Sequence, residues 1–320
     1  MKTYFLWPEH KAQYGRFFLG AKISASDIED TLNSIFPEAV PVLFSSARAG
    51  LSATLQMLEV GRSDIVWCPP YSSHCVLESI ARFATPTTTD VAKAKVALIY
   101  NQWGFVHRHE LKSDTIVIED AVDTFFLPGT TPFSSSGRFA LWSLPKVIGS
   151  TWGGVVFCRN NEGAQKLRAI RDERCGLQTF QAMLRMASDH SIVAAKYWHG
   201  NESMNGGLPA FGLRQIQARL ASIPAIAQHR SRLLDIVRSA KINFQMDEGR
   251  LPSNIPLKIP QQAEKWWGAG GIFSAGIRSM NLAHDFSKDA WGKVAPLPVH
   301  QDISQSVLNL LPLNQFDGVK

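Results

Sequence analysis

The sequence of 320 residues has no long hydrophobic run and only four cysteines. No stretch approaches the roughly 18 consecutive apolar residues that indicate a membrane span. The cysteines show neither CxxC spacing nor a dense arrangement, so neither a zinc site nor a disulfide framework is indicated. The first residues reach Pro8, Glu9 and His10 too soon for a signal peptide. We therefore expect a cytoplasmic protein with free thiols.

Patterns typical of nucleic-acid binding are also missing. The formal net charge is +6, but the basic residues are scattered, and no RRM, helix-turn-helix or zinc-finger pattern is present. A mildly basic balance suits anionic small molecules, phosphates included. We therefore expect small-molecule substrates, and neither a nucleic acid nor a membrane as partner. The length suggests roughly two domains.

Helical and strand patterns alternate through the first half of the chain. Ser26 and Glu29 have the spacing of a capping box, which predicts a helix that ends near Phe36. A short apolar run at 42–44 leads through the small-residue turn 45–49 into another helix. Strands are predicted at 64–70, 96–100, 115–120, 138–143 and 153–158, and a helix at 74–84. The strands are nearly all apolar, which is typical of an α/β sheet covered on both faces.

The pattern changes after about residue 160. Helices are predicted at 162–176, at 178–197 and, interrupted by Pro224, at 212–240. The best linker candidate is 200–209, which is dense in Gly, Asn and Pro. We therefore predict a large α/β domain at 1–200 and a smaller C-terminal α+β domain at 201–320.

Three features of the first half predict a common site. Asp120 ends one apolar strand, and Lys146 follows another within the segment WSLPKVIGSTWGG. In open α/β sheets, ligands bind beyond the carboxyl ends of the strands. The turn 45–49 opens a helix whose backbone N–H groups could hold a phosphate. Together these residues make up the minimal set for pyridoxal phosphate (PLP), although the segment around Lys146 taken alone favours an exposed turn lysine.

Five segments in the right order resemble the DegT/StrS family of PLP-dependent sugar aminotransferases, in the aspartate aminotransferase superfamily. The resemblance covers about residues 40–160, and more weakly LRQIQARLASI and LPVHQDIS near the C-terminus. It implies fold type I, a mixed and mostly parallel sheet sandwiched by helices, and a homodimer with the active site at the interface. The five segments are FSSARAGLSATL, PPYSSHCVLESI, NQWGF, IEDAVDTF and WSLPKVIGSTWGG.

The resemblance also implies roles for individual residues. Lys146 is similar to the lysine that binds the cofactor covalently and moves the proton of the substrate's α-carbon. Asp120 is similar to the carboxylate that keeps the pyridine nitrogen protonated; its alternative is a helix cap or turn. The turn Ala47, Arg48 and Ala49 stands where the family has a Gly-Thr pair that contacts the phosphate. Arg48 could replace the missing hydroxyl with a charge, or it could be solvated.

Other positions depart from the family. Leu141 stands where the family has a serine, and Ser143, on the same face of the strand, could take over its phosphate contact. Ser73 stands where the family has an aromatic residue that stacks on the ring, with His74 beside it as an alternative. Asp123 stands where Gln or His donates to the ring's phenolate oxygen, and an ionised Asp can only accept. We expect that Asp123 is protonated, that it points away, or that the ring is tuned differently.

The family's partner-subunit loop supplies an Asn and an Arg, which align with Ala210 and Gly212; Asn205 could substitute in a shortened loop. The resemblance predicts amination of a keto sugar of the nucleotide-linked kind used in polysaccharide biosynthesis, with glutamate as amino donor. Two alternatives stay open. One is a degenerate member that binds PLP or a sugar nucleotide without turnover, and the other is a PLP enzyme with an amino-acid substrate. The retained lysine argues against the family's dehydratase branch, in which His takes its place.

Overall fold

The computed structural model describes residues 3–9, 19–107, 109, 111–134, 137–174, 206–244, 246–259, 263–268, 270–274, 276–282 and 290–318. Its central element is a seven-stranded sheet with the order β1-β8-β7-β5-β4-β2-β3. In that order the strands are Val40–Phe44, Gly154–Cys158, Phe139–Ser143, Ile116–Asp120, Val96–Tyr100, Ile65–Trp67 and Thr85–Thr87.

The central sheet is mixed and mostly parallel, as predicted. Strands β3, β2, β4, β5 and β7 pair in parallel, whereas β8 is antiparallel to both β7 and β1. In the register of β5 and β7, Asp120 is the partner of Leu141. The carboxyl ends of these two strands therefore lie side by side, which brings the ends of the predicted strands 115–120 and 138–143 to one edge of the sheet.

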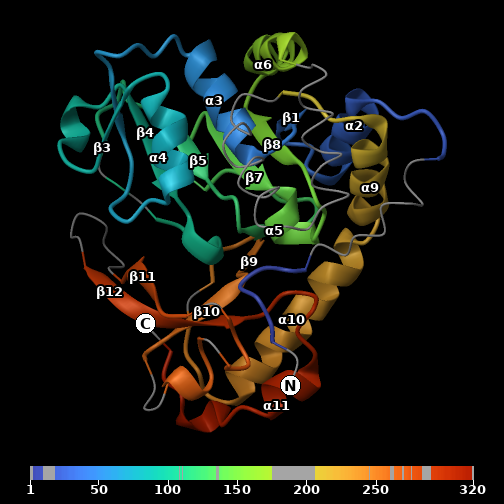
Figure 1. Ribbon diagram of the computed structural model, residues 1–320, viewed down its shortest axis with the longest axis vertical. Coiled ribbons are helices and arrows are strands. Elements are labelled where there is room, and N and C mark those ends of the chain that lie inside the picture. Colours follow the sequence, from blue (N-terminus) through green and yellow to red (C-terminus); the bar gives the residue numbers. More distant parts are fainter. Residues whose placement is uncertain are drawn as a thin grey trace.

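Helices cover both faces of the sheet (Figure 1). On one face, α3, α4 and α6 pack against side chains such as Leu141; on the other, α2, α9 and α10 pack against side chains such as Trp142. Successive residues of β7 thus contribute to opposite cores, as the alternation of side chains along a strand requires. The helices α2, α3, α4, α6, α9 and α10 are Ala25–Ile35, Ala47–Met57, His74–Ala81, Asn161–Glu173, Ala210–Leu220 and Ile223–Ser239.

The predicted capping box at the start of α2 is wrong by two residues. Ser24 is the N-cap, and its side chain and backbone exchange hydrogen bonds with Asp27. Glu29 instead lies on the buried face of the helix, where it accepts a hydrogen bond from Leu43 N at 2.9 Å and forms an ion pair with Arg168 at 2.7 Å. Ser26 has the right spacing to Glu29, but the helix begins too early for Ser26 to cap it.

The long helical pattern at 212–240 forms two helices. Helix α9 ends at Leu220, and Pro224 lies in the first turn of α10, where its missing N–H breaks no helical hydrogen bond. Of the linker candidate, the structure describes 206–209, and Gly206 accepts a hydrogen bond from Ser45 N at 2.9 Å. The predicted helix 178–197 and Asn205 lie outside the described residues.

The C-terminal part has a three-stranded antiparallel sheet in the order β10-β12-β11. The short strand β9 of this part pairs with β6, which follows β5 in the chain, and so connects the C-terminal part to the large domain. Both chain ends lie in this lower part of Figure 1. Of the helices in the described ranges, none has the length and apolar character to cross a membrane. The strands β10, β12, β11, β6 and β9 are Asn254–Leu257, Trp291–Pro298, Arg278–Asn281, Phe125–Phe126 and Arg250–Leu251; the last helix, α11, is Gln305–Asn309.

Candidate active site

The structure brings Asp120 and Lys146 together at the carboxyl ends of β5 and β7. Strand β7 ends at Ser143, and the five-residue helix α5 (Leu144–Ile148) carries Lys146. Ser143 N donates to the carbonyl of Val122 at 3.3 Å, which ties the start of α5 to the residues that follow Asp120. The positive charge of Lys146 acts on both Asp120 and Asp123. Lys146 is half-buried and not an exposed turn lysine.

Asp120 is a buried carboxyl group with few hydrogen bonds. Only 5% of its surface is exposed, and this burial raises its pKa from 3.8 to about 6. Lys146 lowers the pKa, and Asp123 raises it. Val122 N donates to Oδ1 at 3.3 Å. A carboxylate in this position gains from a nearby cation, and a protonated pyridine nitrogen is such a cation.

Asp123 is fully buried and accepts two hydrogen bonds. Tyr100 donates its hydroxyl to Oδ2 at 2.6 Å, and Trp103 N donates to Oδ1 at 2.9 Å. Burial raises the pKa of Asp123, whereas Lys146 lowers it. Burial also raises the pKa of Tyr100 well above 10, so its hydroxyl remains a donor. Sequence reasoning missed Tyr100, although it ends β4 and is the register partner of Asp120.

The N-terminus of α3 lies against the start of β8. A Cβ atom on Gly154 would come within 2.0 Å of Ala47 N, so only glycine permits this approach. Ser46 is the N-cap and accepts a hydrogen bond from Ala49 N at 3.1 Å. Arg48 is half-buried in the first turn. An 11-residue helix with its N-terminus near the ends of β5 and β7 provides the N–H groups and partial positive charge that suit a phosphate.

Ser73 and His74 are both exposed at the start of α4. The Ser73 hydroxyl lies 3.1 Å from the Cys75 sulfur. The structure instead places the ring of Trp7 beside Lys146, with Nζ 4.5 Å from the ring centroid. Sequence reasoning had no signal for this contact, because residue 7 is far from the motifs.

Arg230 is a second residue that sequence reasoning missed. It is fully buried in α10, and one NH2 group donates to the carbonyl of Val147 at 3.0 Å, directly after Lys146. Burial lowers the pKa of Arg230 to about 9, and the charges of Asp123 and Asp302 oppose that shift. The C-terminal part of the chain thus holds the backbone of the helix that carries the lysine.

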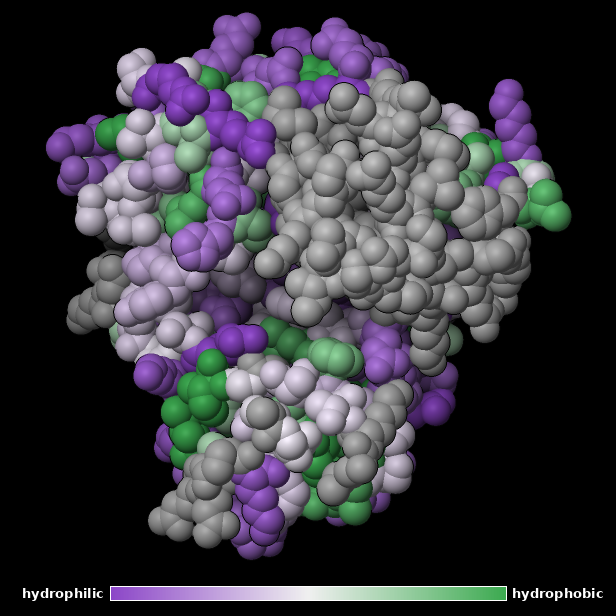
Figure 2. Space-filling view, viewed as in Figure 1, coloured by the Kyte–Doolittle hydropathy of each residue, from purple (hydrophilic) through white to green (hydrophobic). Residues whose placement is uncertain are grey.

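A small pocket lies next to these residues, between the large sheet and the C-terminal strands. Figure 2 shows the surface hollowed between the part formed by α3 and α4 and the part formed by β11 and β12. Tyr100 belongs to both the pocket and the Asp123 contact. Burial and the neighbouring His109 lower the pKa of His107 to about 4, so its imidazole is neutral at pH 7. The pocket is lined by Pro69, Pro70, Tyr100, Gln102, His107, His109, Asn281 and Trp291.

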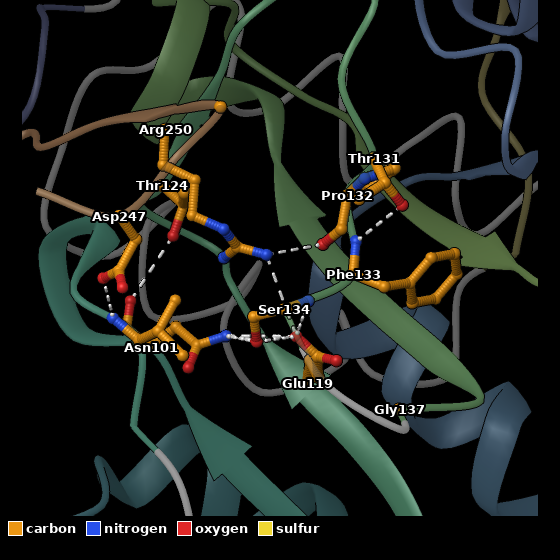
Figure 3. Close-up of polar contacts among 12 residues, drawn as sticks. Asn101, Glu119, Thr124, Thr131, Pro132, Phe133, Ser134, Gly137, Asp247 and Arg250 are labelled. Atoms are coloured by element: carbon orange, nitrogen blue, oxygen red, sulfur yellow. Dashed lines mark hydrogen bonds and ion pairs between the residues drawn. The ribbon is translucent and has the colours of Figure 1, made fainter.

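Glu119, next to Asp120, points to the other side of β5 and belongs to a different network (Figure 3). Its Oε2 accepts hydrogen bonds from Ser134 N at 2.9 Å and from Asn101 Nδ2 at 3.3 Å, and from the Ser134 hydroxyl. Arg250 NH2 lies 3.9 Å from the same oxygen and donates to Pro132 O at 3.0 Å. This network joins β5 to β9.

The predicted places of the partner-subunit loop fall in α9. Ala210 is the first residue of this helix, and Gly212 is buried near Trp152. Neither position carries a polar side chain. The loop residues of the family therefore have no counterpart at these two positions.

The described residues fit PLP. A buried carboxyl group near a lysine and the N-terminus of α3 supply the three contacts that the cofactor needs, a ring-nitrogen partner, an amine and a phosphate site. The burial of Asp120, which raises its pKa to about 6 and leaves it one long hydrogen bond, is the observation that favours a cationic ring nitrogen beside it.

Comparison with known families identifies the class. A family model described as "Putative PLP-dependent aminotransferase" matches residues 28–315. The chain therefore belongs to this family of PLP-dependent aminotransferases and is a transferase that uses pyridoxal phosphate. No curated protein matches the chain.

Solved structures of sugar aminotransferases share the fold. "Putative sugar aminotransferase Spr1654" from Streptococcus pneumoniae is 14% identical, with a TM-score of 0.62 over 97% of this chain and 96% of that one. DesV from S. venezuelae is 14% identical, with a TM-score of 0.60 over 94% and 92%. A DegT DnrJ EryC1 StrS aminotransferase from Brucella abortus is 14% identical, with a TM-score of 0.61 over 92% and 90%. The predicted likeness to DegT/StrS enzymes is confirmed at the level of the fold.

Proposed function

We propose that this aminotransferase aminates a keto sugar, nucleotide-linked, with glutamate as the amino donor. The observation that carries the proposal is the buried Asp120 with the half-buried Lys146 nearby, at the ends of β5 and β7. The shared fold of Spr1654, which is described as a "Putative sugar aminotransferase" in its apo, PMP and PLP forms, supports the sugar substrate. Another solved structure, PseC from Helicobacter pylori, is described as involved in the biosynthesis of pseudoaminic acid.

The chemistry supplied by bound pyridoxal phosphate is an electron sink for the substrate's α-carbon. Lys146 would hold the cofactor, and its neutral amine would move the proton to and from that carbon. Asp120 keeps a proton on the ring nitrogen, because its own charge is unfavourable in the buried site without a cationic partner.

The N-terminus of α3, with the backbone of Ala47, Arg48 and Ala49, binds the phosphate. Ser143 lies at the end of β7 on the face of Leu141 and adds a hydroxyl, and the Arg48 side chain adds a charge.

Asp123 fixes side chains and backbone next to the cofactor ring. Because both of its oxygens accept hydrogen bonds from the protein, Asp123 fixes the Tyr100 hydroxyl and the loop at Trp103. Ser73 and His74, at the exposed start of α4, border the cofactor site on the side of the solvent.

The pocket beside Tyr100 receives the sugar. Aromatic rings and neutral polar groups recognise a sugar ring, since its C–H faces stack on aromatic side chains and its hydroxyls need donors and acceptors. Trp291, Gln102, Asn281 and the neutral imidazole of His107 provide these groups.

The family resemblance supports three further proposals. The protein acts as a cytoplasmic homodimer with the active site at the interface, it serves polysaccharide biosynthesis, and its two domains divide at residues 200 and 201.

A single-turnover reaction with L-glutamate tests the proposed donor. The PLP-loaded enzyme is expected to form one 2-oxoglutarate per active site without any acceptor, because the amino group stays on the cofactor. Lys146→Ala is expected to form none, whereas Lys265→Ala, at an exposed lysine remote from the site, matches the wild type. Loaded wild type that forms no 2-oxoglutarate contradicts glutamate as the donor.

A further inference from the structure

The N-terminal segment 3–9 lies against the C-terminal part of the chain and is fixed there by backbone hydrogen bonds. Tyr4 N donates to Ile272 O at 2.8 Å, and Ser274 N donates to Tyr4 O at 2.9 Å. His300 Nε2 lies 2.9 Å from Phe5 O. These contacts hold the first half of the segment at a defined place.

Contacts on the other side of residue 7 complete the anchoring. Glu9 N donates to Asp302 Oδ2 at 2.6 Å. Gly149 ends α5 with a φ of 70°, and a Cβ atom at this position would lie 3.3 Å from Pro8 Cβ. The segment therefore packs directly on the helix that carries Lys146, and residue 7 has little freedom to leave it.

Trp7 occupies the centre of this anchored segment. Its ring centroid is 4.5 Å from Lys146 Nζ. The ring also packs against the cluster that contains Leu6 and Trp103, and Trp103 N binds Asp123. The indole Nε1 is buried without a hydrogen-bond partner among the described residues. Trp7 thus lies beside the lysine, on the side of the site formed by Asp123 and the C-terminal strands.

The position of Trp7 bears on the missing aromatic residue of α4. Ser73 and His74 are exposed, and the ring next to the lysine comes instead from the N-terminal segment. An aromatic face attracts an ammonium through its quadrupole and does not attract the neutral amine. A contact of this kind holds the ammonium over the face of the ring.

We propose that Trp7 is a positioning residue that holds the Lys146 amine through the face of its indole ring. The proposal rests on the proposed role of Lys146. The N-terminal segment thus places the amine for its reaction with the cofactor.

The test is the rate at which Lys146 is methylated by formaldehyde and cyanoborohydride at fixed pH, in the full chain freed of PLP. Peptide mass spectrometry reads every lysine in one experiment. Trp7→Leu keeps an apolar side chain but removes the ring face that holds the amine, so Lys146 is expected to react about two- to fivefold faster than in the wild type. Trp7→Phe keeps an aromatic face and is expected to stay near the wild-type rate.

A matched control uses Lys265, an exposed lysine of the described ranges that also contacts a tryptophan. Lys265 Nζ lies 5.5 Å from the ring centroid of Trp266. Trp266→Leu is expected to raise the methylation rate of Lys265 and to leave Lys146 at its wild-type rate. A change at Lys146 in this variant would indicate a general loosening of the fold.

Two outcomes overturn the proposal: Lys146 reacts at the wild-type rate in Trp7→Leu, or Trp7→Phe reacts as fast as Trp7→Leu. The first shows that the ring does not act on the amine, and the second that only bulk matters. Neither outcome depends on the cofactor, so a failure of Lys146 to bind PLP would contradict the proposed function separately from this inference.

Discussion

Two neighbouring carboxyl groups on β5, both buried, differ in their hydrogen-bond partners. Glu119 is fully buried and accepts hydrogen bonds from Ser134 and Asn101, with Arg250 3.9 Å away (Figure 3). Asp120, the next residue, is 5% exposed and accepts one long hydrogen bond from Val122 N. Burial raises the pKa of Asp120 to about 6.

This difference indicates that Glu119 has a structural role and that Asp120 belongs to the active site. A buried charge is stable when donors and an opposite charge surround it, and Oε2 of Glu119 has hydrogen bonds from Asn101 and Ser134 and the cation of Arg250 nearby. Asp120 lacks such partners and interacts with Lys146 across the end of the sheet. A buried carboxyl group whose proton affinity is raised by its own fold is typical of a functional position.

The largest expected effect is on catalysis by Asp120. Asp120→Asn removes the charge beside the ring nitrogen, and we expect kcat to fall by about 10²–10³. Glu119→Gln is expected to keep kcat within about threefold, because Glu119 faces the other side of β5. Steady-state rates of both variants measure this contrast. Equal losses of kcat in Asp120→Asn and Glu119→Gln would contradict the different roles of the two carboxyl groups.

The second prediction concerns the stability provided by Glu119. Glu119→Gln removes the carboxylate 3.9 Å from the buried Arg250, which keeps only the weaker charge effect of Asp247 in the described part of the chain, and we expect a loss of about 4 kcal/mol in the free energy of unfolding. Urea denaturation measures this loss. Glu162→Gln serves as a control, since its pair with Lys166 is exposed and is worth only a few tenths of a kcal/mol. A loss at Glu119 no larger than at Glu162 would contradict the scaffold role.

The third prediction follows from the pKa of Asp120. Because the folded state raises this pKa from 3.8 to about 6, the stability from the bound proton is present below pH 4 and is lost as the pH rises through 6. Between pH 4 and 7 the cofactor-free wild type should therefore lose about 2–3 kcal/mol relative to Asp120→Asn. Urea midpoints of both proteins at several pH values measure the difference. A constant difference would show that the buried carboxyl group does not titrate in this range.

The smallest effect sharpens the site itself. Ser143→Ala removes one neutral hydroxyl from the proposed phosphate site, and we expect PLP affinity to fall about five- to tenfold. Equilibrium titration with PLP measures the change. Ser134→Ala changes a hydroxyl of the Glu119 network and is expected to leave PLP affinity unchanged. A larger loss of PLP affinity in Ser134→Ala than in Ser143→Ala would contradict a phosphate site at the end of β7.

The sequence predicted the strands well, because apolar runs bounded by turn residues mark β4, β5, β7 and β8 within one residue. It also predicted that Asp120 and Lys146 meet, since adjacent parallel strands end at one edge. It misjudged Glu29, whose carboxylate was interpreted as part of a cap and is instead buried with Arg168. Local spacing cannot distinguish a cap from a partner 139 residues away.

Contacts between distant segments escaped prediction for the same reason. Trp7, Arg230 and Tyr100 reach the site from the N-terminal segment, α10 and β4, and no short motif contains them. Glu119 and Asp120 form one motif in the sequence, and only the alternation of side chains across β5, followed by the hydrogen bonds on each side, separates their roles.

The most direct test of this separation is the visible absorption spectrum with added PLP for the wild type, Lys146→Ala and Glu119→Gln. The account predicts a band of the lysine-bound cofactor in the wild type and in Glu119→Gln, and none in Lys146→Ala. Borohydride reduction should then leave the cofactor's mass on Lys146. A band that survives in Lys146→Ala, or cofactor attached to another lysine, would contradict the placement of the active site at the ends of β5 and β7.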